Sequence, residues 1–119
     1  ELPIPVITSP LGGEILTSGE QTRIEWNIIN SNVQFIDSIG VYHSSDAGET
    51  WTLEESWTSP EIPVYFDFTV PETDTISFYN KFRIIVLDIG DYGGENNGIH
   101  YDITDDLIII ANNNLEHKS

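Results

Sequence analysis

The chain has 119 residues and a formal net charge of −16 at pH 7, because 20 Asp and Glu stand against 4 Lys and Arg. This acidic balance disfavours nucleic acids and anionic membranes as partners, and the chain has no apolar run of the ~20 residues that span a bilayer. It also has no cysteine, which excludes a disulfide framework and a thiolate metal site.

Four segments carry strand patterns, whereas helical periodicity is not evident. They are residues 21–28, 65–70, 81–87 and 107–111. The side chains expected to face a core are Ile24, Trp26 and Ile28, then Phe66, Phe68 and Val70, then Phe82, Ile84 and Val86. The alternate side chains of residues 81–87 include further apolar ones, so this strand is expected to be central and partly covered on both faces.

Turn signals rich in Gly, Pro, Asn and Ser separate these segments at nearly regular spacing. About seven short strands in roughly 100 residues are typical of an antiparallel β-sandwich of the immunoglobulin or fibronectin kind. We therefore predict an all-β protein with one such module in residues 1–111. Residues 112–119 are interpreted as a disordered tail or a vector-derived scar.

Residues 44–51 read SSDAGETW, which is the S-x-D-x-G-x-x-W pattern of an Asp-box hairpin. A strand over residues 39–43 is expected to lead into it. Ser44 opens the pattern, Asp46 offers a side-chain acceptor to the nearby backbone, and Gly48 can adopt the positive φ that other residues resist. Trp51 is expected to fold back over the turn. The pattern indicates a structural hairpin and not a catalytic group.

Several motifs occur in an order that resembles one family. They are residues 7–16 (ITSPLGGEIL), 19–26 (GEQTRIEW), 44–51, 66–71 (FDFTVP) and 102–105 (DITD). The chain resembles the immunoglobulin-like accessory modules of secreted bacterial and archaeal proteins. It is also similar to the N-terminal domain of fungal Ser/Thr-rich, GPI-anchored cell-wall proteins. The resemblance implies a non-catalytic β-sandwich within a larger extracellular protein. Phe68 and Leu11 depart from the family pattern, which usually has Trp and Asn there.

Aromatic residues offer a candidate sugar-binding platform. Trp57 stands in a loop-like context, Tyr65 is expected on an outward strand face, and Tyr92 lies in a Gly-rich segment. A flat aromatic ring can stack on the C–H face of a pyranose. The alternative is that Trp57 is an ordinary edge aromatic. Trp26, in contrast, is expected to be a core tryptophan between two sheets.

The segment from residue 88 to 102 is a candidate calcium loop. Calcium takes six to eight hard oxygen ligands, and four glycines in this segment would give it flexibility. The candidate ligands are Asp88, Asp91, Glu95, Asn96 and Asp102. Their spacing matches neither an EF-hand nor an RTX repeat, and a solvated hairpin loop explains the same residues.

No nucleophile elbow or phosphate loop is visible, and His43 falls on the inward register of its strand, where a hydrogen-bonded, partly buried histidine is expected. The leading hypothesis is a non-catalytic spacer, stabilising or protein-contact module, monomeric when isolated, outside the cell or on its surface. Its partners would be other domains of the parent protein, and it would need no cofactor. The alternative is a carbohydrate-binding module that uses the exposed aromatics, with polysaccharide as the partner and calcium as support.

Overall fold

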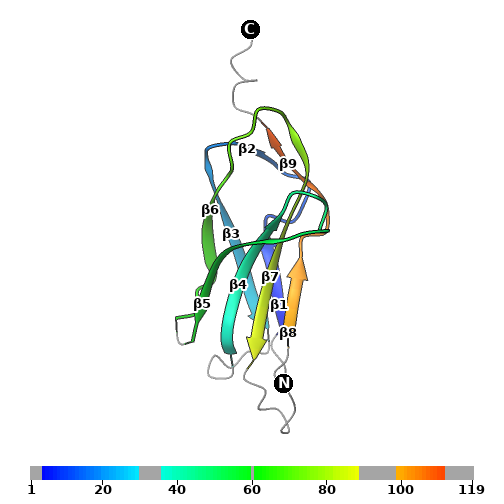
Figure 1. The fold of residues 1–119 in the computed structure, drawn as a ribbon. Coiled ribbons are helices and arrows are strands. Elements are labelled where there is room, and N and C mark those ends of the chain that lie inside the picture. Colours follow the sequence, from blue (N-terminus) through cyan, green and yellow to red (C-terminus); the bar gives the residue numbers. More distant parts are fainter. Residues whose placement is uncertain (1–3, 30–35, 60, 89–98, 112–119) are drawn as a thin grey trace.

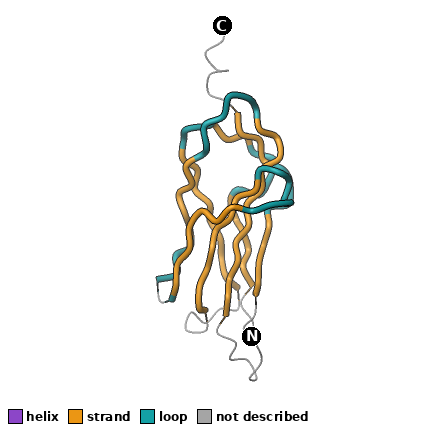
Figure 2. Tube along the Cα trace, in the orientation of Figure 1, coloured by secondary structure: helices purple, strands orange, loops and turns teal. Residues whose placement is uncertain are grey.

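The computed structural model describes residues 4–29, 36–59, 61–88 and 99–111. Within these ranges the chain forms nine strands and no helix. Figures 1 and 2 show how the strands are arranged. The strands are β1 (Ile4–Ser9), β2 (Ile15–Thr17), β3 (Gln21–Ile29), β4 (Ile36–Ser44), β5 (Thr52–Thr58), β6 (Tyr65–Thr69), β7 (Ser77–Asp88), β8 (Ile99–Ile103) and β9 (Ile108–Ala111). The all-β prediction is confirmed. The described ranges hold no helix that is long and apolar enough to cross a lipid bilayer.

The strands form two sheets. One has the order β1-β3-β6, and the other has the order β2-β9-β7-β4-β5, with β8 also paired to β7. Strand β7 therefore has β4 on one side and both β8 and β9 on the other, which confirms that it is central. The two C-terminal strands follow one another along the same edge of β7. The partners of β8 are residues 83–87 and those of β9 are residues 77–80.

Two interruptions explain why nine strands occur where about seven are typical. β8 and β9 are halves of one broken strand along β7, and β2 lies beyond β9. β1 and β2 are separated by Gly12 and Gly13, whose φ angles of 121° and 87° let the chain cross from the first sheet to the second. The Glu14 carboxylate closes this crossing, because it accepts hydrogen bonds from the backbone N–H groups of Leu11 (2.9 Å) and Gly12 (2.8 Å).

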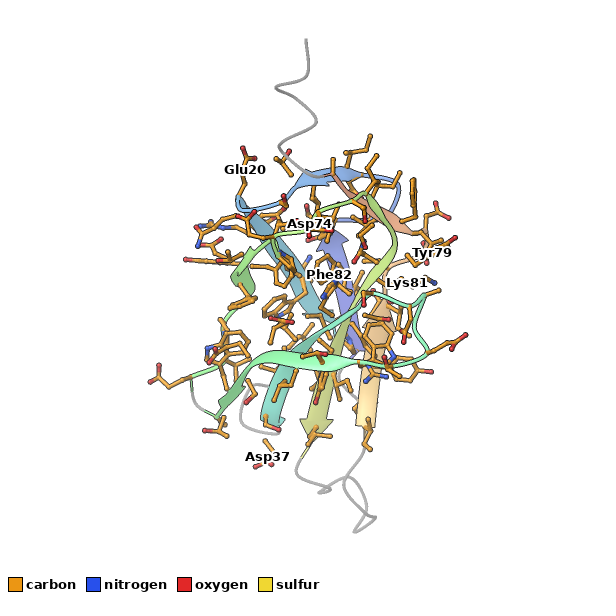
Figure 3. The ribbon with its side chains drawn as sticks, turned by 45° about the horizontal axis from the view of Figure 1, so that its top comes forward. Glu20, Asp37, Asp74, Tyr79, Lys81 and Phe82 are labelled. Atoms are coloured by element: carbon orange, nitrogen blue, oxygen red, sulfur yellow. The ribbon has the colours of Figure 1, made fainter. Side chains whose placement is uncertain are left out.

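The core lies between the two sheets and consists mainly of the side chains that alternation predicts. Ile24, Trp26, Phe68, Val70, Phe82, Ile84 and Val86 are all buried, and Ile28 and Phe66 are partly buried against them. Phe82 is buried in this interior, whereas Glu20, Asp37 and Asp74 are exposed; Figure 3 labels all four residues. His43 is also buried, and its Nε2 lies 2.9 Å from Asn80 Oδ1, as its register predicts.

Candidate functional site

The 44–51 turn is closed by side-chain hydrogen bonds. Asp46 Oδ1 accepts from the Thr50 N–H (2.8 Å), and Asp46 Oδ2 accepts from the Thr50 hydroxyl (2.5 Å). Ser44 Oγ donates to Asp46 Oδ1 (2.7 Å) and accepts from the Gly48 N–H (2.8 Å). Gly48 has a φ of 94°, which is the region that glycine adopts without strain.

The turn also contacts β7, the strand next to β4 in the same sheet. A Cβ added to Gly48 would lie 3.4 Å from Cζ2 of Trp51, so the indole lies close against the turn. The Arg83 guanidinium of β7 lies 4.4 Å from the centre of the Trp51 ring. The Ala47 N–H donates to the Tyr79 carbonyl at 2.9 Å. These contacts hold the turn against the side of β7.

We expect the stabilisation of the 44–51 turn by Asp46 to depend on pH. Hydrogen bonds from the Thr50 hydroxyl and amide lower the pKa of Asp46 to about 2, from an ordinary value of 3.8. A depressed folded-state pKa means that the stabilisation is complete above pH 3.8 and is lost as the pH falls through about 2. Urea unfolding should therefore show that Asp46→Asn has a lower free energy of unfolding than wild type at neutral pH. This difference in free energy should become smaller in acid.

The matched control is Glu49→Gln, which removes an exposed carboxylate of the same turn. We expect it to remain close to wild type at neutral pH. The difference in free energy of unfolding between Asp46→Asn and wild type could instead stay constant down to pH 2. That result would show that the carboxylate does not close the turn.

The predicted aromatic platform is not assembled among the described residues. Trp57 lies in strand β5 and not in a loop, and its ring packs against Trp26 (centroids 6.1 Å apart) and Phe66 (5.8 Å). The loop expectation was wrong, because pairing with β4 makes this segment a strand. Tyr65 precedes Phe66 in β6 and therefore faces the opposite side of its sheet. Tyr92 lies outside the described residues.

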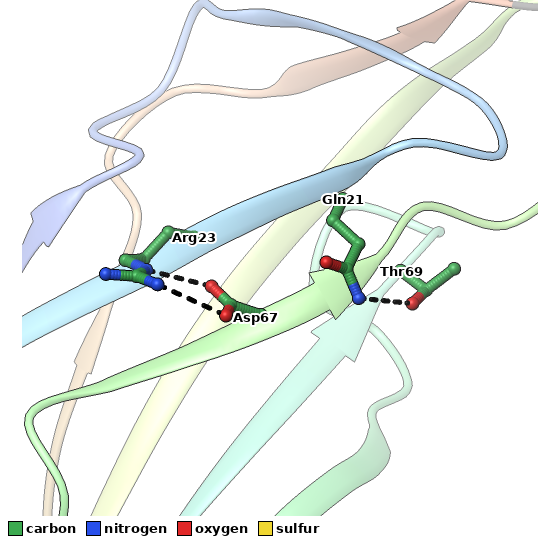
Figure 4. Close-up of polar contacts among 4 residues, drawn as sticks. All are labelled: Gln21, Arg23, Asp67 and Thr69. Carbon is green, nitrogen blue, oxygen red and sulfur yellow. Dashed lines mark hydrogen bonds and ion pairs between the residues drawn. The ribbon is translucent and has the colours of Figure 1, made fainter.

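Tyr65 is 43% exposed, but a cation already covers its ring. The Arg23 guanidinium lies 3.9 Å from the ring centre and forms a two-pronged ion pair with Asp67, in which Nε lies 2.9 Å from Oδ1 (Figure 4). The hydrogen bond raises the pKa of Arg23 and lowers that of Asp67. With the weak Gln21–Thr69 contact beside it, this makes a polar ladder on the outside of the β3–β6 pair.

Most of the predicted calcium ligands lie outside the part of the chain that the structure describes. Asp91, Glu95 and Asn96 lie outside the described residues, as does the side chain of Asp88. Asp102 lies in β8, where its Oδ2 accepts a hydrogen bond from the backbone N–H of Ile7 at 2.7 Å, and so links β8 to β1. The part of the chain that is described holds no group of three or more metal-ligating side chains. The calcium loop stays a prediction.

The described surface has shallow depressions near two of these residues. One, of about 300 Å³, is lined by Trp57, Glu61, Ile62 and Pro63. The Pro63 carbonyl beside it accepts the indole N–H of Trp26 at 3.1 Å. A second, of about 280 Å³, lies between β1 and β8 and includes Asp102.

Arg83 is a candidate functional residue that sequence reasoning missed. Its guanidinium lies between the rings of Tyr42 (5.0 Å to the centroid) and Trp51 (4.4 Å). Its Nε is the one buried side-chain N or O atom, among those described, that has no hydrogen-bond partner. The available signal was a basic residue within the otherwise apolar run of residues 82–87 in a strongly acidic chain.

Comparison with known proteins gives similarity in fold and not in sequence. No family model matches the chain, and no curated protein matches it. A solved structure of the fibronectin(III)-like modules of Clostridium thermocellum CbhA aligns with a TM-score of 0.61 and 17% identity, over 98% of this chain and 50% of that one. A structure of murine CRIg aligns with a TM-score of 0.55 and 10% identity, over 89% of this chain and 97% of that one.

The fold is therefore an immunoglobulin-like β-sandwich, of the type that fibronectin(III)-like modules share. This confirms the predicted fold class. The chain spans about half the length of the CbhA structure that it matches.

Proposed function

We propose that the chain is a non-catalytic module of a larger extracellular or cell-surface protein, in which it spaces and supports the neighbouring domains. The immunoglobulin-like fold supports this proposal, since such domains are typically binding or structural modules whose function depends on grafted surface sites. The ordered motifs that resemble accessory modules of secreted proteins give independent support for the location.

The observation that carries the proposal is the position of the two ends of the described fold. Ile4 at the start of β1 pairs with Ile29 at the end of β3. Ala111 at the end of β9 pairs with Thr17, only a short turn before β3 begins at Gln21. The chain thus enters at one end of β3 and leaves near the other, about 30 Å apart for a strand of this length (Figure 1). When the chain enters a β-sandwich at one end and leaves it at the other, the sandwich keeps the domains on either side of it apart.

The test is deletion and replacement within the parent protein. Removing residues 1–111 should impair the parent's adhesion or catalysis on an extended target. Replacing them with an unrelated β-sandwich of similar pole-to-pole length should restore it. A deletion that leaves every measured property of the parent unchanged would refute the supporting role. Antibody labelling of intact cells tests the location, and labelling only after lysis would refute it.

A further inference from the structure

The register of the larger sheet aligns three rows of residues across β5, β4, β7 and β8. The rows are Leu53, Tyr42, Arg83 and Ile103; Ser56, Gly40, Ile85 and Tyr101; and Thr58, Ser38, Leu87 and Ile99. The residues that alternate with them in β4 and β7 (Ile39, Val41, Ile84 and Val86) are buried in the core. Because successive side chains of a strand point to opposite faces, these three rows lie on the outside of the sheet. We call them the outer face.

The three rows contain no Asp or Glu, although the chain has 20 of them; Glu54 of β5 lies beside the rows, where the pairing of β5 with β4 shifts register. It exposes large apolar side chains instead: Ile99 is 66% exposed, Tyr101 61% and Leu53 50%. The outside of the β3–β6 pair is different, since it carries the Arg23–Asp67 ion pair. Apolar side chains that share one exposed sheet face of an acidic domain indicate an interaction site.

Arg83 supplies the charge of these three rows, and Lys81, two residues before it in β7, lies on the same side of the sheet beyond them. The Tyr42 ring lies close over the sheet at Gly40, where a Cβ would lie only 3.1 Å from Cε1 of Tyr42. The absence of a side chain at Gly40 therefore makes room for this ring. That ring and Trp51 hold the guanidinium in place. Stacking uses the faces of a guanidinium and leaves its N–H donors at the edge, where they match a carboxylate. None of the described acids pairs with Arg83.

We propose that the outer face binds a separate protein chain, whose contact surface is apolar and places a carboxylate against Arg83. The proposal rests on the proposed function in taking this chain as a module that other proteins can reach. Charge complementarity identifies the partner's carboxylate, because a guanidinium buried in an apolar interface without an anion would be strongly unfavourable.

Other occupants fit the outer face less well. The three rows of a second copy hold no carboxylate for Arg83, and a second copy adds another net charge of −16. Domains of the same parent chain would join at the poles, whereas this face lies along the flank. Branched aliphatic residues such as Ile85, Leu87 and Ile99 favour apolar protein side chains over a sugar, which needs convergent hydrogen-bonding groups.

The test uses a phage-displayed library of random peptides as the probe, selected on the folded chain and counter-selected on the variant Ile85→Asp. We expect the enriched peptides to be apolar and to carry Asp or Glu. Changing that acid to its amide should weaken binding about tenfold to the wild-type chain, as expected for loss of a hydrogen bond to a charged group. The same change should have little effect on binding to Arg83→Gln, which already lacks the partner.

Two exposed tyrosines provide matched variants that should both fold, which thermal unfolding would verify. Tyr101→Ser removes a ring from the outer face, and Tyr65→Ser removes one from the opposite sheet. Peptide binding should fall in the first variant and persist in the second.

Three results would overturn the proposal. The first is selection that yields no peptides, or yields basic peptides that bind wild type and Ile85→Asp equally. The second is reversible self-association in sedimentation that Ile85→Asp abolishes, which would make a second copy the occupant. The third is binding to a glycan array that Tyr101→Ser removes. The supporting-module proposal would survive each of them, because deletion and replacement in the parent protein test it separately.

Discussion

Replacing Trp26 with alanine is expected to lower the free energy of unfolding by about 3–5 kcal/mol, which is the usual cost of truncating a large buried aromatic side chain. Trp26 is 1% exposed and lies between the sheets, against Trp57. The substitution would leave a cavity and also remove the indole N–H that donates to the Pro63 carbonyl at 3.1 Å. Urea unfolding followed by circular dichroism would measure the change.

Two further variants separate the contributions. Trp26→Phe keeps most of the apolar volume but leaves the Pro63 carbonyl without its donor, so we expect a smaller loss of about 1–3 kcal/mol. Trp57→Ala removes a half-buried ring at the edge of the sheet and should also cost less than Trp26→Ala. If Trp57→Ala were the more damaging of the two, the centre of the core would lie elsewhere.

Much of the core could be predicted because its burial is encoded locally. In β3 and β6, apolar side chains alternate with polar ones, so the sequence itself distinguishes the inner face of each strand from the outer. Trp26 and Phe68 follow this pattern and are buried as expected. The polar partners on the outside, such as Arg23 and Asp67, follow from the same alternation.

Strand β5 was not predicted because its own sequence carries no strand pattern. Its sequence, TLEESWT, carries two adjacent glutamates and no regular alternation of burial, and a Ser-Pro pair follows shortly after it. Charged residues of this kind are common on edge strands, where they discourage further pairing. Its conformation is set by hydrogen bonds to β4. Such pairing with another strand cannot be recognised from a short segment of sequence.

The outer face was missed for a related reason. Arg83, Ile85 and Leu87 are readable as one side of a strand, and that side was expected to be partly covered. Their neighbours Tyr42 and Tyr101 come from β4 and β8, and only the register of three strands places them together. The absence of acids from the three rows becomes visible once that register is known.

Replacing Asn80 with leucine is expected to cost about 3 kcal/mol, because several buried polar groups lose their partner at once. Asn80 is 1% exposed. Its Nδ2 donates to the carbonyls of Ser77 (3.1 Å) and Ile108 (3.0 Å), at the irregular pairing between β7 and β9. Its Oδ1 lies 2.9 Å from Nε2 of His43. Thermal or urea unfolding of the variant would measure the loss.

A double-mutant cycle tests whether the two side chains act as a pair. Since Nδ2 of Asn80 is occupied by its acceptors, Oδ1 must accept, and His43 must donate from Nε2. His43 also packs between the rings of Phe68 and Phe82, each 5.2 Å away between centroids, so His43→Phe keeps an aromatic ring there. We expect Asn80→Leu combined with His43→Phe to cost less than the sum of the single changes, by about 0.5–3 kcal/mol. Simple additivity would mean that the hydrogen bond contributes nothing, and that Asn80 matters only through the backbone carbonyls it bridges.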